Sequence, residues 1–206
     1  SYTTTGGSST STSASEVDGQ TITFGSGTFV AALDGSSPLN RIVAGNQEVT
    51  AAAYKYTATN ETYTVKEVTV EVGSAAISSV ISTVQLYDGA TPVGNPVAFS
   101  QSSNTQALIT GLNVVVPANS TKVITAKLML NTIGTSAGTS QSNAALTLAN
   151  TKYSDSQGVE ANYTTDRAGN ELYVFKTIPT LAQVDLSTGT LVNDQATDIY
   201  KFTVSA

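Results

Sequence analysis

Four carboxylates gather in one short stretch of the chain. The segment YSDSQGVEANYTTDRAGNE contains Asp155, Glu160, Asp166 and Glu171 among Asn and Gly residues. Oxygen atoms presented by turns are the ligands that Ca²⁺ prefers. The spacing differs from that of an EF-hand, however, and most acidic loops are simply solvated. Asp155, Glu160 and Asp166 are therefore only weak calcium candidates. The sequence predicts no other metal site and no cofactor.

Three Asn-x-Ser/Thr sequons provide acceptor sites for N-linked glycans. They begin at Asn60, Asn119 and Asn162. All three fall at expected turns or strand ends, where a glycan would project into solvent. A chain so rich in Ser and Thr contains a few sequons by chance. Unmodified turns are therefore the alternative interpretation.

The residue types that the chain lacks exclude most catalytic chemistry. The sequence has no His, Cys or Trp. Disulfides, zinc sites built on thiolate or imidazole, and Ser-His-Asp or Cys-His catalytic units are thus excluded. Paired carboxylates could still hydrolyse glycosides, but such clefts are usually lined by aromatic residues and this chain has no Trp. We expect a protein that is not an enzyme.

Composition indicates a protein that works outside the cell. Only 12% of the 206 residues are charged, and Ser, Thr, Ala, Gly and Val take their place. The net charge is −6 and the nine Lys and Arg residues are scattered, which argues against nucleic-acid binding. No apolar run approaches the roughly 18 residues of a membrane-spanning helix. We expect a secreted protein at the cell surface.

Most of the chain reads as short β-strands with turn residues between them. No segment has sustained helical periodicity. Alternation and β-prone composition predict an all-β fold, an immunoglobulin-like antiparallel β-sandwich over residues 36–206. Strict alternation in the second strand segment would place Tyr63, Val65 and Glu67 on the face opposite Val68 and Val70. The predicted strand segments are 48–59, 61–72, 78–89 with 91–99 as a hairpin, 107–120, 120–132, 144–150, 171–179 and 199–206.

The N-terminal part has a different character. Residues 1–19 form a Ser/Thr-rich tail that cannot offset its ordering entropy alone, so we expect it to lie along a neighbouring subunit. Residues 20–35 alternate with a Gly25-Ser26-Gly27 interruption, which predicts a bent strand. This strand is our first candidate for donation to a neighbour. The side chains expected to fill pockets are Ile22, Phe24, Phe29, Ala31 and Leu33.

A strand motif occurs twice in the sequence. Residues 54–59 read YKYTAT and residues 200–205 read YKFTVS, within the longer similar segments 43–59 and 191–205. The first copy opens the sandwich, whereas nothing follows the second copy in this sequence. Two explanations compete: a piece of a tandem array, or a C-terminal strand that completes a groove in another subunit. A chance match between two Thr- and Tyr-rich strands is the third explanation.

Three segments carry a resemblance to known proteins. IVAGNQEVTAAAYKYTATNETYTVKEVTVEV, ISTVQLYDGATPVG and LNVVVPANSTKVITAKLML make residues 40–206 resemble the β-sandwich modules of bacterial and archaeal surface proteins, often arranged in tandem. Such modules build S-layers, adhesins and extracellular filaments. The architecture is also similar to that of pilus subunits that exchange donor strands. The resemblance implies a structural role and assigns no catalytic residue.

These observations lead to two hypotheses. The first is a subunit of an extracellular filament or pilus, a homopolymer held together by β-strand complementation and serving surface attachment or biofilm formation. One donor and one groove on each copy give a head-to-tail contact that propagates into a fibre. The alternative is an S-layer or adhesin module that folds alone and binds cell wall or carbohydrate. The two differ in whether residues 20–33 are buried in their own chain.

Overall fold

A computed structural model describes residues 26–134, 140–186, 193, 196 and 199–206. The Ser/Thr-rich tail and the donor candidates Ile22 and Phe24 lie outside the described residues. The elements are β1 (Thr28–Leu33), β2 (Arg41–Ala44), β3 (Glu48–Thr59), β4 (Tyr63–Glu71), α1 (Ala75–Ser78), β5 (Ile81–Asp88), β6 (Thr91–Val97), β7 (Gln106–Ile109), β8 (Val114–Val116), β9 (Ser120–Leu130), β10 (Ser142–Asn143), β11 (Thr147–Ser154), β12 (Glu160–Tyr163), β13 (Arg167–Ala168), β14 (Leu172–Phe175), β15 (Thr180–Gln183) and β16 (Phe202–Ser205).

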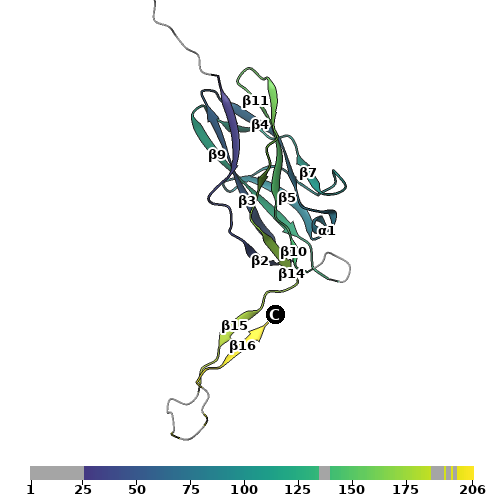
Figure 1. The fold of residues 1–206 in the computed structure, drawn as a ribbon, viewed down its shortest axis with the longest axis vertical. Coiled ribbons are helices and arrows are strands. Elements are labelled where there is room, and N and C mark those ends of the chain that lie inside the picture. The colour runs from purple at the N-terminus through teal and green to yellow at the C-terminus, as the bar shows by residue number, and fades with distance from the viewer. Residues whose placement is uncertain (1–25, 135–139, 187–192, 194–195, 197–198) are drawn as a thin grey trace, which may run out of the picture.

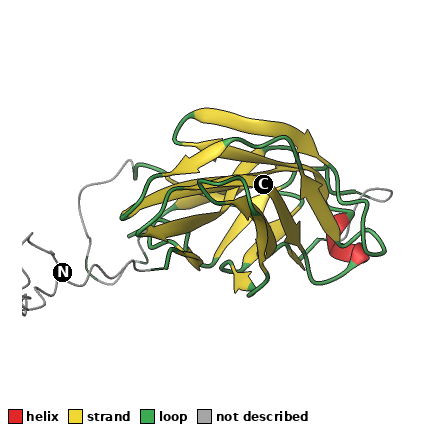
Figure 2. Ribbon diagram, turned by 90° about the horizontal axis from the view of Figure 1, so that it is seen from above, coloured by secondary structure: helices red, strands yellow, loops and turns green. Residues whose placement is uncertain are grey.

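Two large sheets form the body of the molecule (Figure 1). The first has the strand order β1-β3-β9-β5-β6. The second has the order β12-β11-β4-β7, with β13 paired to β11 and β8 paired to β4. Strands make up nearly all of the body, and the four-residue helix α1 lies at its side (Figure 2). The expected all-β sandwich is confirmed.

The core lies between the two large sheets, and β9 shows how alternation fills it. Ile124, Ala126 and Leu128 on β9 are almost fully buried, whereas Met129 is 44% exposed. Two hydroxyl groups on β3 reach across the core to the other sheet. Tyr54 Oη donates to the carbonyl of Leu146 at 2.8 Å, and Tyr56 Oη lies 3.2 Å from Thr151 Oγ1. These bonds satisfy the polar ends of two buried aromatic side chains.

A β-bulge in β4 changes the predicted assignment of faces. Val68 pairs with Thr151 of β11 and Val65 pairs with Tyr153, so Lys66 is left without an opposite residue. An extra residue shifts the alternation of every residue beyond it by one. Consequently Val65 and Val68 are both buried. The prediction that they occupy opposite faces of one regular strand was wrong.

A third, smaller sheet has the order β10-β14-β2 and includes a parallel pair. Leu172 of β14 pairs with Arg41 of β2, and the register continues in parallel to Phe175 and Ala44. The sequence predicted an antiparallel sandwich, and this parallel pair is an exception to that prediction. No helix of the described residues is long and apolar enough to cross a membrane.

Alkaline pH should destabilise the fold through the two tyrosines of β3. Burial raises the pKa of Tyr56 to about 12, and it also raises the pKa of Tyr54. In the unfolded chain both groups titrate near pH ~10, so the unfolded state loses its protons first. The free energy of unfolding should be insensitive to these groups below about pH 9. It should then fall by about 1.4 kcal/mol per pH unit for each buried tyrosine as the pH approaches the folded-state pKa.

The Tyr56→Phe variant provides the control for this prediction. It removes the hydrogen bond to Thr151 and should cost about 1 kcal/mol near neutral pH. Above about pH 10 its stability should decline less steeply than that of the wild type, because one titrating group is missing. Urea unfolding at a series of pH values measures both slopes, and parallel slopes would contradict the assignment to Tyr56.

Candidate assembly site at the terminal strands

Strand β1 lies at the edge of the first sheet, and among the described strands it pairs with β3 alone. Its register runs antiparallel from Thr28↔Thr59 to Leu33↔Tyr54. Phe29 and Ala31 are 6% and 0% exposed, and Leu33 packs partly buried against the same core. These three donor candidates therefore fill the core of their own chain in this structure. The strand belongs to the same sheet as β3, although the sequence suggested a domain beginning at residue 36.

The ring of Phe29 is the centre of an aromatic cluster between the two sheets. It stacks on Tyr56 of its own sheet with a centroid distance of 5.5 Å. It also contacts Tyr63 of β4 at 5.5 Å and Tyr153 of β11 at 4.2 Å. Aromatic pairs at such distances add to the stability gained from burial alone. Phe29 thus anchors the terminal strand to both layers of the sandwich.

The outer edge of β1 is closed by side chains from the second sheet. The carbonyl oxygen of Ala31 accepts hydrogen bonds from Arg167 Nε at 2.7 Å and from Tyr163 Oη at 3.1 Å. The Arg167 guanidinium also bonds to the Tyr163 hydroxyl and lies over its ring, 5.5 Å from the centroid. An edge carbonyl that is already satisfied is a poor template for another strand. This clamp therefore favours the seated position of β1.

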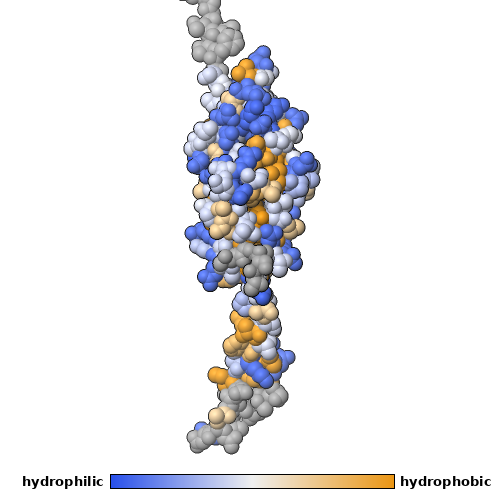
Figure 3. All heavy atoms as spheres, turned by 90° about the vertical axis from the view of Figure 1, so that its right-hand side faces the viewer, coloured by the Kyte–Doolittle hydropathy of each residue, from blue (hydrophilic) through white to orange (hydrophobic). Residues whose placement is uncertain are grey.

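Strands β15 and β16 form a separate hairpin beyond the sandwich (Figure 1). They pair antiparallel with each other and with no other strand of the described chain. Their apolar side chains are exposed, and they appear as an orange patch on the hairpin (Figure 3). The exposed fractions are 73% for Leu181, 63% for Tyr200, 54% for Phe202 and 59% for Val204.

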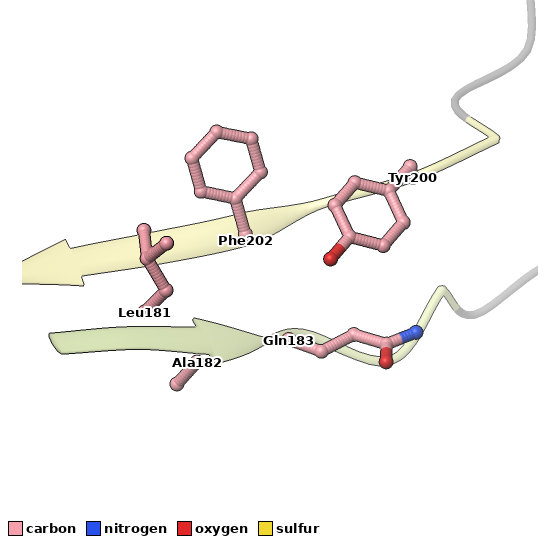
Figure 4. A pocket seen from close by; sticks show the side chains of 5 residues that line it. All are labelled: Leu181, Ala182, Gln183, Tyr200 and Phe202. Atoms are coloured by element: carbon pink, nitrogen blue, oxygen red, sulfur yellow. The ribbon is translucent and has the colours of Figure 1, made fainter.

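One face of this hairpin is apolar. Leu181 lies opposite Val204 and Gln183 lies opposite Phe202, so these side chains share a face. Figure 4 shows Phe202 and Leu181 on one side of the hairpin and Ala182 on the other. An open hollow of about 350 Å³ is lined by Leu181, Ala182, Gln183, Tyr200 and Phe202. Strand β16 lies within the predicted segment 199–206, whereas β15 was not predicted because its four residues are too few to show alternation.

The calcium candidates have other partners. The Asp155 carboxylate accepts the backbone N–H groups of Gln157 and Val159 at 2.9 and 2.8 Å. Glu160 forms an ion pair with Lys152 at 2.8 Å. Within the described part of the chain, no three carboxylates, Asp166 included, come together as a set of metal ligands. The structure therefore does not assemble the predicted cluster.

The three sequon asparagines are all exposed. Asn60 and Asn119 have φ values of 62° and 56°, the left-handed conformation that Asn tolerates better than most residues. Asn119 Oδ1 also accepts the backbone N–H of Asn60 at 2.9 Å. Turn geometry alone thus accounts for asparagine at these two positions. Asn162 lies on β12, where its side chain accepts a hydrogen bond from Asn150. Glycosylation stays a prediction.

No family model matches the chain, and no curated protein matches it. Among solved structures, AvmM, described as catalysing macrocyclization in alchivemycin A biosynthesis, is similar with a TM-score of 0.34 and 9% identity over 69% of this chain and 89% of that one. BcpA, the major pilin subunit of Bacillus cereus, is similar with a TM-score of 0.31 and 8% identity, over 77% of this chain and 42% of the pilin. A variant of BcpA is similar with a TM-score of 0.31 and 11% identity, over 72% of this chain and 40% of the variant. Similarities this weak do not identify the function of the chain.

Replacing Phe29 should reveal how firmly β1 is held. Phe29→Ala should lower the free energy of unfolding by about 3–5 kcal/mol, because it leaves a cavity between the two sheets. Val30→Ala is the matched control: Val30 is the next residue of the same strand and is 44% exposed. That change should cost no more than about 0.5 kcal/mol. Chemical denaturation measures both, and equal losses would show that Phe29 is not seated in this core.

Proposed function

We propose that this protein is a non-catalytic structural subunit of an extracellular filament, whose copies join by exchanging the terminal strand β1. The observation that carries the proposal is the position of β1: the first strand of the described residues lies at a sheet edge, with Phe29 and Ala31 in the core. An identical strand from another copy would make the same contacts. Exchange therefore conserves the interactions of the closed molecule while linking one copy to the next.

The connection after β1 provides a short hinge. Ser37 is held against β3, because its hydroxyl donates to the carbonyl of Ala53 at 2.9 Å and accepts the N–H of Ala53 at 2.8 Å. Only Asp34, Gly35 and Ser36 separate this anchor from β1. Asp34 caps the turn by accepting the N–H and hydroxyl of Ser36. Release of β1 would break the hydrogen bond from the Asp34 N–H to the Ala53 carbonyl at 2.8 Å, and rotation at Gly35 and Ser36 would then redirect β1 while Ser37 stays in place.

The overall shape suits head-to-tail growth. In Figure 1, β1 enters the sandwich at one end of the long axis, and the β15–β16 hairpin lies beyond the other end. A contact between two different surfaces of each copy propagates as an open chain rather than closing as a dimer. The low charge and the lack of Cys and His agree with a structural protein outside the cell.

The second candidate function is a self-contained surface module, such as part of an S-layer or adhesin. It is favoured by the burial of Phe29 and Ala31 in their own chain and by the Arg167–Tyr163 clamp on Ala31. In that case β1 never leaves its sheet, and the protein contacts cell wall or carbohydrate as a folded monomer. One crosslinking experiment distinguishes the two functions.

The double variant Val30→Cys, Thr57→Cys should trap β1 wherever it pairs. These residues face each other directly across β1 and β3, and directly paired residues lie about 5 Å apart, within reach of a disulfide. After assembly at high concentration and oxidation, exchanged strands should give a ladder of covalent multimers on a non-reducing gel. Reduction should collapse the ladder to monomer.

Three results bear on this experiment. Each single-cysteine variant is a control and should give at most a dimer, because one thiol cannot extend a chain of links. Oxidation at high dilution before assembly should link β1 to β3 of its own chain. Filaments should then be absent from negative-stain images until reductant is added. A double variant that yields only internally linked monomer at every concentration would rule out exchange of β1 and leave the self-contained module.

A further inference from the structure

The β15–β16 hairpin repeats the pairing of β1 with β3. When residues 200–205 are aligned with residues 54–59, the pair Thr180↔Ser205 falls on Thr28↔Thr59. The next pair, Leu181↔Val204, falls on Phe29↔Ala58, and the remaining pairs follow without a shift. The sequence match concerned only one strand. The structure adds a second strand, β15, which pairs antiparallel with the repeat, as β1 pairs antiparallel with β3.

The same face of each pair is mainly apolar, and the exception is Gln183, which stands at the place of Ala31. In β1 and β3 that face is buried in the core, and in the hairpin it is exposed to solvent. Tyr54, buried at 1% exposed, corresponds to Tyr200 at 63%. Phe29, at 6%, corresponds to Leu181 at 73%. Both copies of the repeat thus have an antiparallel partner strand and a face on which apolar side chains gather.

The first pair shows what such a face requires as a partner. The second edge of β3 is covered by β9, from Glu48↔Met129 to Ala58↔Ser120. The apolar face is covered by the second sheet, where Leu146 and Thr151 bond the hydroxyls of Tyr54 and Tyr56. Strand β16 has neither kind of neighbour among the described residues. An open strand edge beside an exposed apolar face is a docking surface.

We infer that β15 and β16 are the opening strand pair of a second sandwich module of this same fold, linked in tandem. The partner of the hairpin is the remainder of such a module. A strand of the β9 type pairs along β16, and a sheet of the β4–β11 type covers the face formed by Leu181, Tyr200, Phe202 and Val204. This inference does not depend on exchange of β1.

One similarity and one difference between the pairs define the partner more closely. Tyr200 keeps the hydroxyl of Tyr54, so the covering sheet supplies an acceptor such as the carbonyl of Leu146. Phe202 replaces Tyr56 and has no hydroxyl, so no counterpart of the Thr151 hydroxyl is needed at that position. Because an unpaired buried hydroxyl is costly, an apolar residue in the place of Thr151 fits better.

A fusion protein tests the inference in the full chain. Residues 1–205 are followed directly by a second copy of residues 60–186, so that the hairpin stands where β1 and β3 stand in the first module. We expect a second sandwich to fold around the hairpin. Amide hydrogen exchange of residues 200–205 should then be slower by about 100-fold or more than in the unfused chain, because local opening becomes tied to unfolding of a module.

Two charge substitutions in the fusion serve as a matched pair. Phe202→Asp places a charge on the apolar face and should abolish protection of residues 200–205. Thr203→Asp lies on the opposite face of the same strand and should leave protection intact. In every case, hydrogen-exchange protection of β3 and β9 shows whether the first module is folded. Equal effects of the two substitutions would overturn the inference.

Two other outcomes would also overturn it. The appended segment could stay unprotected while the first module is folded, which would show that the hairpin does not nucleate a sandwich. Alternatively, the unfused chain could acquire protection of residues 200–205 simply on concentration from about 5 to 500 μM, a range chosen to reveal association between copies. That result would assign the apolar face to a contact between copies. Neither result depends on the crosslinking of β1.

Discussion

The rest of the structure depends on the packing of the inward face of β3 against the opposite sheet. This strand pairs with β1 on one side and β9 on the other, and its two tyrosines reach the opposite sheet. A strand in that position has hydrogen-bonded neighbours at both edges and a sheet packed against one face. These three contacts explain why Tyr54 and Tyr56 are each only 1% exposed. The edge strand β1 completes one of the three contacts.

The hairpin presents the same two-strand unit with most of those contacts missing. Its pairing satisfies one edge of each strand, but two strands alone cannot shield a face, and isolated hairpins are marginal in water. The contrast between β3 and β16 therefore measures what the remaining strands contribute. The two pairs differ in their covering layers, whereas both are antiparallel and their strand sequences are similar.

The sequence predicts most of the sandwich because alternation is a local property. Strand β9 lies within the predicted segment 120–132, and its alternating residues Ile124 and Leu128 are buried. Strand β4 departs from the prediction at Lys66, because a bulge depends on the partner strand and leaves no signature in a run of alternating residues. The parallel pairing of β2 with β14 joins residues about 130 apart in sequence, so no local pattern reveals it.

The candidate site was predicted only in part, for related reasons. Phe29 and Ala31 were predicted from their spacing to fill pockets as part of a donor strand; in this structure they are buried in their own chain, and donation to a neighbour stays a prediction. Strand β15 was missed because four residues give no periodicity, and its signal lies in the register with β16 rather than in its own composition. Pairing information comes from three-dimensional contacts, and a single sequence does not contain it.

The edges of the first sheet limit how copies could join. At one edge, Arg167 and Tyr163 occupy the carbonyl of Ala31. At the other edge, β6 contains Pro92 and Pro96, which lack backbone donors. Neither edge is thus a good template for simple addition of a foreign strand. The proposed replacement of β1 would keep the contacts of Phe29 and the hydrogen bonds to the Ala31 carbonyl, whereas addition of a strand to either edge would gain neither.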